Sequence, residues 1–196
     1  MFRIPPATQA LILSCVVMFF AQSFLNLDSL ALWPLGSGAF MPWQVVSYAF
    51  LHGGLSHLIF NMFGLYMFGA ELERVWGPRR LLVFYFMSVL CAAAAQLGVA
   101  AWSGSMVPTI GASGGLFGLL LGFAMIFPHR KIVPLIPPIP MPAWLFVLLY
   151  GLIELGLGVT GSLAGVAHFA HLGGLLGGWL TLRYWRGQPP FGRGRR

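Results

Sequence analysis

The chain has 196 residues, of which 58% are hydrophobic and only 8% are charged, and its mean hydropathy is +0.84. A soluble domain carries roughly 25% charged residues, so this composition excludes an ordinary soluble protein and predicts an all-α integral membrane protein. The formal charge of +7 would suggest a nucleic-acid partner in a soluble chain, but here the basic residues lie beside the ends of apolar segments. We therefore expect the basic residues to set the topology of the chain in the membrane and to contact membrane lipid, and we expect no nucleic-acid partner. The length fits one domain, taken as a single membrane domain over residues 1–196.

Six apolar segments follow one another along the chain, and most reach the roughly 20 residues that a membrane-spanning helix needs. The fourth segment, held between Pro108 and Pro128, is short. The first has Arg3 ahead of an apolar run, as signal peptides do, but it lacks a convincing small-residue cleavage site, so we expect a retained helix. The six segments cover residues 7–27, 55–75, 80–101, 113–127, 142–160 and 165–186.

The basic residues are confined to alternate connections. Ten of the eleven lie beside the ends of the second, fourth and sixth segments, and Arg3 is the eleventh. The connections 28–54, 102–112 and 161–164 hold none. Because basic residues concentrate in cytoplasmic loops, we expect six crossings with both termini in the cytoplasm and a basic tail over 187–196.

The two long connections differ in character. The outer one, 28–54, is rich in aromatic residues and is expected to lie at the membrane interface. The inner one, 128–142, holds six prolines and is expected to be a stiff, non-helical link.

Three polar residues fall at similar depths in the predicted bundle. At 1.5 Å per helical residue, Asn61, Ser113 and His171 lie about 20, 22 and 18 Å above the cytoplasmic edge of a hydrocarbon core of about 30 Å. All three are therefore expected in the outer half of the membrane.

Small residues predict which helices pack together. Gly114, Gly118 and Gly122 recur every four residues in the fourth segment, and Gly174 and Gly178 do so in the sixth, on the face that carries His171. Such spacing lets helix backbones approach closely in a membrane. Close packing of these two segments would bring Ser113 and His171 together.

These residues suit acyl-transfer chemistry. A serine hydroxyl needs a base within hydrogen-bond reach, and neutral imidazole is the usual base near pH 7. The run Gly111–Ala112–Ser113–Gly114 at a helix start offers backbone N–H groups to an oxyanion, and the Asn61 amide and His57 could add donors. Because Glu154 stands alone on the fifth segment and the other acids lie near the edges, we expect a Ser–His dyad without a carboxylate.

Metal binding is the alternative for the histidines. Four of them could ligate zinc, but no HExxH motif or cysteine cluster accompanies them, so we expect no metal and no cofactor. The four are His52, His57, His168 and His171.

Three motifs together resemble a known family. They are H-G-G-L-S-H-L-I-F-N from His52 to Asn61, G-x-S-G over Gly111–Gly114, and A-H-L-G-G-L-L-G-G over Ala170–Gly178. In order and spacing, the chain resembles the rhomboid intramembrane serine proteases in their basic six-helix form, over about 50–186.

The resemblance implies a six-helix rhomboid-like bundle with Ser113 as nucleophile and His171 as general base. It also implies an oxyanion hole formed by His57, Asn61 and the backbone N–H of Ser113. Glu73 and Gly77 resemble the structural Glu and Gly of the family.

Two departures and one competitor accompany the resemblance. Phe117 stands where the family often has Tyr packed on the catalytic His, so stacking is retained and a hydroxyl is lost. Trp43–Gln44 stands where some members have Trp–Arg. His168 competes with His171 as base, but the small-residue register favours His171, and His168 is expected to line the outer, water-accessible side.

The expected function is cleavage of single-pass membrane proteins near the outward-facing ends of their helices. Two alternatives remain: a catalytically inactive rhomboid-like protein that binds membrane helices, and a small transporter that uses Glu154 for ion coupling. Short loops and the lack of an organelle-targeting segment favour a bacterial cytoplasmic membrane. The oligomeric state stays open.

Overall fold

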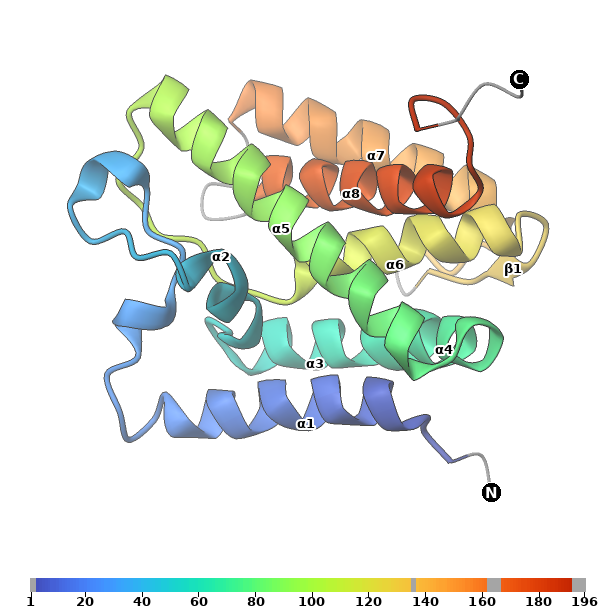
Figure 1. The fold of residues 1–196 in the computed structure, drawn as a ribbon, viewed down its shortest axis with the longest axis horizontal. Helices are drawn as coiled ribbons and strands as arrows, with labels where there is room; N and C mark the ends of the chain where they lie inside the picture. Colours follow the sequence, from blue (N-terminus) through green and yellow to red (C-terminus); the bar gives the residue numbers. More distant parts are fainter. Residues whose placement is uncertain (1–2, 135–136, 162–166, 192–196) are drawn as a thin grey trace.

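The computed structural model describes residues 3–134, 137–161 and 167–191. Apart from two short strands, the elements of this described part are helical (Figure 1). The longer helices are α1 (Pro6–Ala21), α3 (Leu55–Gly64), α4 (Ala70–Trp76), α5 (Pro78–Ser103), α6 (Ser113–Ile126), α7 (Ala143–Thr160) and α8 (His168–Trp185). The shorter elements are η1 (Asp28–Leu30), η2 (Leu35–Ser37), α2 (Gln44–Ser47), η3 (Tyr48–Phe50), the π-helical turn η4 (Leu65–Gly69), and the strands β1 (Lys131–Ile132) and β2 (Met141–Pro142).

Among the described residues, the long helices form six segments that match the six predicted ones. Elements α3, η4 and α4 run on without a break, so they make one segment. The first helix ends at Ala21, six residues before the predicted end, because the chain turns there and leads into the outer connection. By length and composition, α5 and α7 could each cross a membrane, and α1 and α6 are apolar but shorter.

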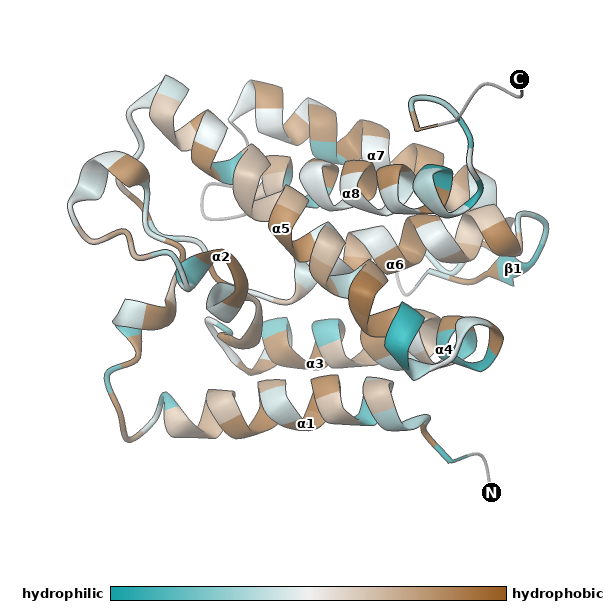
Figure 2. Cartoon of the chain, in the orientation of Figure 1, coloured by the Kyte–Doolittle hydropathy of each residue, from teal (hydrophilic) through white to brown (hydrophobic). Residues whose placement is uncertain are grey.

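The two ends of the bundle have different compositions. The start of α1, the end of α8, α4 and β1 lie at one end, and the connection 28–54 lies at the other (Figure 1). At the first end, Glu71 bridges Arg74 and Arg130, each at 2.8 Å, and hydrophilic colour gathers there in Figure 2. The described residues of the three basic segments therefore share one end, as the sequence predicted, while residues 192–196 of the basic tail lie outside the described part of the chain.

A buried carboxylate holds the start of α1. The Glu73 side chain accepts hydrogen bonds from the backbone N–H of Ala7 at 2.9 Å and from the N–H and hydroxyl of Thr8, both at 2.7 Å. Glu73 thereby pairs N–H groups that the first turn of a helix leaves open. Gly77, at φ +79°, follows one turn later and lets the chain reverse from α4 into α5. The structural role expected of these two residues is confirmed.

Glycine faces bring α6 and α8 into backbone contact. A Cβ on Gly174 would overlap the carbonyl oxygen of Gly114, and one on Gly178 would lie 3.0 Å from the carbonyl oxygen of Gly118. The other face of α8 packs on α5, where a Cβ on Gly173 would lie 2.7 Å from the carbonyl oxygen of Cys91. The predicted packing of the fourth and sixth helices is confirmed.

The outer and inner connections are both anchored to the bundle. In the outer one, Leu32 and Thr109 exchange two backbone hydrogen bonds of 3.0 Å, which ties residues 28–54 to the segment leading into α6. The inner one is not wholly irregular, since β1 and β2 pair antiparallel within it. Residues 135–136 of this link lie outside the described part of the chain.

Candidate active site

Ser113 stands at the first position of α6, directly after a constrained turn. Gly111 has φ +127°, a conformation that favours glycine, and its N–H donates to the carbonyl of Tyr48 at 2.9 Å. Ala112 is fully buried and precedes the helix as its N-cap. The turn therefore fixes Ser113 where the backbone N–H groups of a helix start have no carbonyl partner of their own.

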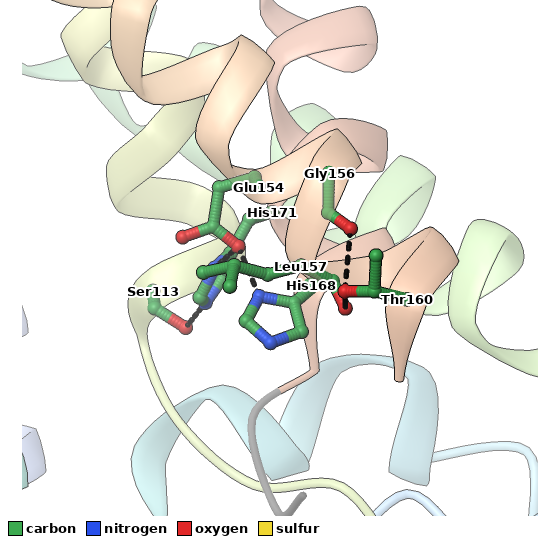
Figure 3. A network of polar contacts seen from close by, with 7 residues as sticks. All are labelled: Ser113, Glu154, Gly156, Leu157, Thr160, His168 and His171. Carbon is green, nitrogen blue, oxygen red and sulfur yellow. Dashed lines mark hydrogen bonds and ion pairs between the residues drawn. The ribbon is translucent and has the colours of Figure 1, made fainter. Parts of the chain in front are cut away.

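The hydroxyl of Ser113 and the imidazole of His171 are in direct contact. Ser113 Oγ lies 2.7 Å from His171 Nε2, although 58 positions separate the two in sequence (Figure 3). Phe117, one turn after Ser113, stacks on the His171 ring with centroids 4.3 Å apart and planes 5° from parallel. The predicted pairing and the predicted stacking are both confirmed as geometry.

Donors from α3 face the same serine. The N–H of Gly53 donates to His57 Nδ1 at 3.4 Å. Because Nδ1 accepts this bond, the proton of the neutral ring is on Nε2. That Nε2 lies beside Gly111, since a Cβ there would be 2.8 Å from it and 3.7 Å from Ser113 Oγ. Asn61 is buried one turn below and donates to the carbonyl of His57 at 2.8 Å.

These side chains line one cavity. Its volume is about 660 Å³. The lining includes His57, Asn61, Ser113, Phe117 and His171. The structure therefore brings the predicted nucleophile, base and donors to one surface.

The expectation that no carboxylate lies near His171 is wrong. Glu154 Oε2 lies 2.9 Å from His171 Nδ1 and 2.7 Å from His168 Nδ1. The contact with His168 has hydrogen-bond geometry, whereas the contact with His171 is close but lies off the N–H direction. The sequence predicted no contact between Glu154 and His171 because it does not show that α7 packs on α8 at the height of His171.

His168 lines a second, smaller cavity. It is only 6% exposed and also faces Glu154, a contact that the sequence did not predict. Because His168 is buried against Glu154, His171 is the histidine that contacts Ser113, as the spacing of the glycines in α8 predicted. One ligand atom each from Glu154, His168 and His171 lie within 4.8 Å of one another, so this cluster is also the place where the described residues could hold a metal ion.

Comparison with known proteins agrees with the motifs. The Rhomboid domain family model matches residues 39–187, which is most of the chain. The chain belongs to the rhomboid family. It is accordingly an all-α membrane protein of a family that includes intramembrane serine proteases.

Similar rhomboids occur in distant organisms. The chain is 32% identical over 150 residues to Rhomboid protein 1, mitochondrial, of Saccharomyces cerevisiae, covering 70% of this chain and 40% of that protein. It is 28% identical over 191 residues to Rhomboid protease GlpG of Serratia proteamaculans, covering 92% and 62% respectively. It is also 29% identical over 145 residues to Rhomboid protease GluP of Bacillus subtilis, covering 71% and 25%. The chain thus spans between a quarter and two thirds of the length of these relatives.

Proposed function

We propose that this rhomboid is an active intramembrane serine endopeptidase, with Ser113 as nucleophile and His171 as general base. The observation that carries the proposal is the 2.7 Å contact between Ser113 Oγ and His171 Nε2 inside a cavity that reaches Asn61 and His57. A serine that only bonded its own helix would not need a base from another helix.

The first half of the reaction follows from this contact. His171 Nε2 takes the hydroxyl proton as Ser113 Oγ attacks a peptide carbonyl, and the carbonyl oxygen becomes an oxyanion. The imidazolium then gives the proton to the leaving amine, and an acyl-enzyme remains on Ser113. Water replaces the amine in the second half, and the same proton transfers release the acid.

The proposed oxyanion hole has three donors. The backbone N–H of Ser113 begins α6, the Nε2–H of His57 lies beside Gly111, and the Asn61 amide lies one helical turn away from His57. Preorganised donors of this kind are usually the largest single contribution to acyl-transfer catalysis. Gly111 supports this arrangement, because a Cβ there would lie 2.8 Å from His57 Nε2.

The proposed topology has six spans with both termini in the cytoplasm. The basic connections share one end of the bundle, which supports placing that end inside. With 14 residues, α6 is about 21 Å long, against a hydrocarbon core of about 30 Å. If its inner end reaches the cytoplasmic edge, Ser113 lies below the outer surface of a membrane that we propose is the bacterial cytoplasmic membrane.

The proposed substrates are single-pass membrane proteins cut near the outward end of their helix. An intact helix keeps its carbonyls hydrogen-bonded, so helices weakened by Gly, Pro or small polar residues should be preferred. The reaction needs water but no cofactor, because the base and the donors come from the chain itself.

A tagged model substrate tests the proposal. Wild-type protein and the Ser113→Ala variant are each co-expressed with a membrane protein whose helix carries a Gly–Ala pair near its outer end. Cleavage by wild type alone is expected. Ser23→Ala, at an exposed serine in the turn that follows α1, is the matched control and should cleave like wild type.

Two results would contradict the proposal. Equal fragments from wild type and Ser113→Ala would assign the cleavage to another enzyme. Absence of cleavage together with co-purification of the intact substrate helix would favour a catalytically inactive rhomboid-like binding protein.

A further inference from the structure

The acidic residues of this chain are few, and Glu154 is the one that lies beside His171. The chain has four in all. Asp28 lies in the outer connection, Glu71 pairs with two arginines at the basic end, and Glu73 caps α1. Glu154, by contrast, is only 9% exposed and projects from α7 onto α8. A buried carboxylate without compensation is costly, so its position calls for an explanation.

The packing of α7 against α8 is built around this side chain. Gly158 lies one turn after Glu154, and a Cβ there would come within 3.2 Å of the Cβ of His168 and 3.1 Å of the Phe169 ring. The missing side chain lets the two helices approach at the level where α8 begins. Glu154 Oε2 thereby reaches the Nδ1 atoms of both His168 and His171 (Figure 3).

The carboxylate determines which nitrogen of His171 carries the proton. The contact lies off the N–H direction, but the charge of a carboxylate oxygen 2.9 Å from Nδ1 still disfavours a lone pair there and favours an N–H. The proton therefore resides on Nδ1, and Nε2 presents its lone pair to the Ser113 hydroxyl at 2.7 Å. This is the tautomer that a general base requires.

The same charge acts when the proton moves. As Ser113 gives its proton to Nε2, the ring becomes an imidazolium, and Glu154 is the negative group beside it. His168 donates a hydrogen bond of 2.7 Å to the same oxygen and so fixes the carboxylate in place. No proton has to pass to Glu154 in this step.

We propose that Glu154 is a positioning residue of the active site: anchored by His168, it holds His171 in the Nδ1–H tautomer and stabilises its protonated form. The dyad is thereby completed by a carboxylate from α7. This inference rests on the proposed peptidase function, which the wild-type protein must show first.

The test uses a fluorophosphonate probe, because its reaction with Ser113 needs the base but no substrate helix. In purified full-length protein, Glu154→Gln should lower the labelling rate about 100-fold, since glutamine keeps the size and removes the charge. Glu154→Asp should restore part of it. Glu71→Gln makes the same chemical change at the basic end of the bundle and should label like wild type.

Substrate kinetics separate positioning from binding. Glu154 is absent from the lining of the cavity that holds Ser113. Glu154→Gln should therefore lower kcat with little change in KM. A rise in KM with unchanged kcat would overturn the inference, and so would equal labelling of a folded Glu154→Gln protein and the wild type.

A spectroscopic measurement on the wild type reports the tautomer of His171 without any change at Glu154. Nitrogen-15 shifts of labelled histidine, with the His171 signal assigned by its loss in His171→Ala, should report the Nδ1–H tautomer at neutral pH. A Nε2–H tautomer would overturn the inference. So would a loss of labelling on treatment with EDTA, which would show that Glu154, His168 and His171 hold a metal ion instead.

If the wild-type protein labels and Glu154→Gln labels equally, the peptidase stands and the role of Glu154 falls. If the wild type does not label at all, the peptidase function itself is refuted. The two failures are thus distinct.

Discussion

The hydrogen bonds of Glu73 allow a quantitative prediction of how firmly α1 is held in the bundle. This carboxylate is only 3% exposed and accepts three hydrogen bonds from Ala7 and Thr8, at the N-terminus of α1. Glu73→Gln keeps one acceptor oxygen but removes the charge and puts an NH₂ group where an acceptor is needed. The start of α1 should therefore loosen, while the rest of the bundle is unchanged.

The expected magnitude follows from those bonds. Hydrogen bonds to a charged group contribute about 1.5–3 kcal/mol each, against about 0.5–1.5 kcal/mol for neutral ones. A negative charge at a helix N-terminus adds roughly 0.3–1 kcal/mol. With two bonds weakened, one lost and the charge removed, Glu73→Gln should destabilise the docking of α1 by at least about 3 kcal/mol. At 1.4 kcal/mol per tenfold change, the open population rises at least about 100-fold.

Cys15 provides the assay. Its side chain is fully buried on the inner face of α1, so a thiol reagent reacts only when α1 opens. In a Cys91→Ser background, Glu73→Gln should speed the labelling of Cys15 by that factor. Glu71→Gln is the matched control: its ion pairs are exposed and contribute about 0–1 kcal/mol, so labelling should rise about fivefold at most. Unchanged labelling in Glu73→Gln would refute the reasoning.

Four further predictions concern the site and its supports. Gly174→Ala places a methyl group against a backbone carbonyl of α6, so the melting temperature and fluorophosphonate labelling should fall together; a stable, fully labelled variant would contradict the packing. Asn61→Ala removes one oxyanion donor and should lower kcat about 100- to 1,000-fold with the melting temperature retained, which steady-state cleavage would measure. Phe117→Ala removes the ring stacked on His171 and should lower labelling about tenfold, whereas Phe117→Tyr should keep it; the reverse order would be inconsistent with stacking. Burial, together with the neighbouring His57, lowers the pKa of His52 in the outer connection to about 4, so the folded state disfavours its protonation. The stability of the protein should therefore fall as the pH drops from about 6.5 towards 4. In thermal melts, His52→Asn should make the melting temperature depend less on pH over this range.

The helices and their packing partners could be predicted because each produces a recognisable local pattern in the sequence. Long apolar runs mark the helices, and the basic residues mark the end of the bundle at which Arg74 and Arg130 meet Glu71. Glycines at fourfold spacing identify α6 and α8 as neighbours, and the contact between Ser113 and His171 follows from that register. These inferences need only helix geometry and composition.

The place of Glu154 could not be predicted in the same way. Its contact with His171 depends on how α7 lies against α8, and α7 carries a glycine at only a few positions rather than a continuous small-residue face. A single ionisable residue in an apolar helix does signal a buried partner, but it does not say which one. The missed end of α1 has a similar origin, since the apolar residues continue past Ala21 into a turn that hydropathy does not distinguish from helix.

Mass spectrometry of the fluorophosphonate adduct tests the central claim most directly. The purified protein in detergent is treated with the probe, digested and analysed for the modified residue, alongside His171→Ala and Ser23→Ala. The contact between Ser113 and His171 predicts an adduct on Ser113 in wild type and Ser23→Ala, and its loss in His171→Ala. An unmodified Ser113 in the wild type, or equal modification without His171, would contradict a base-activated nucleophile at this site.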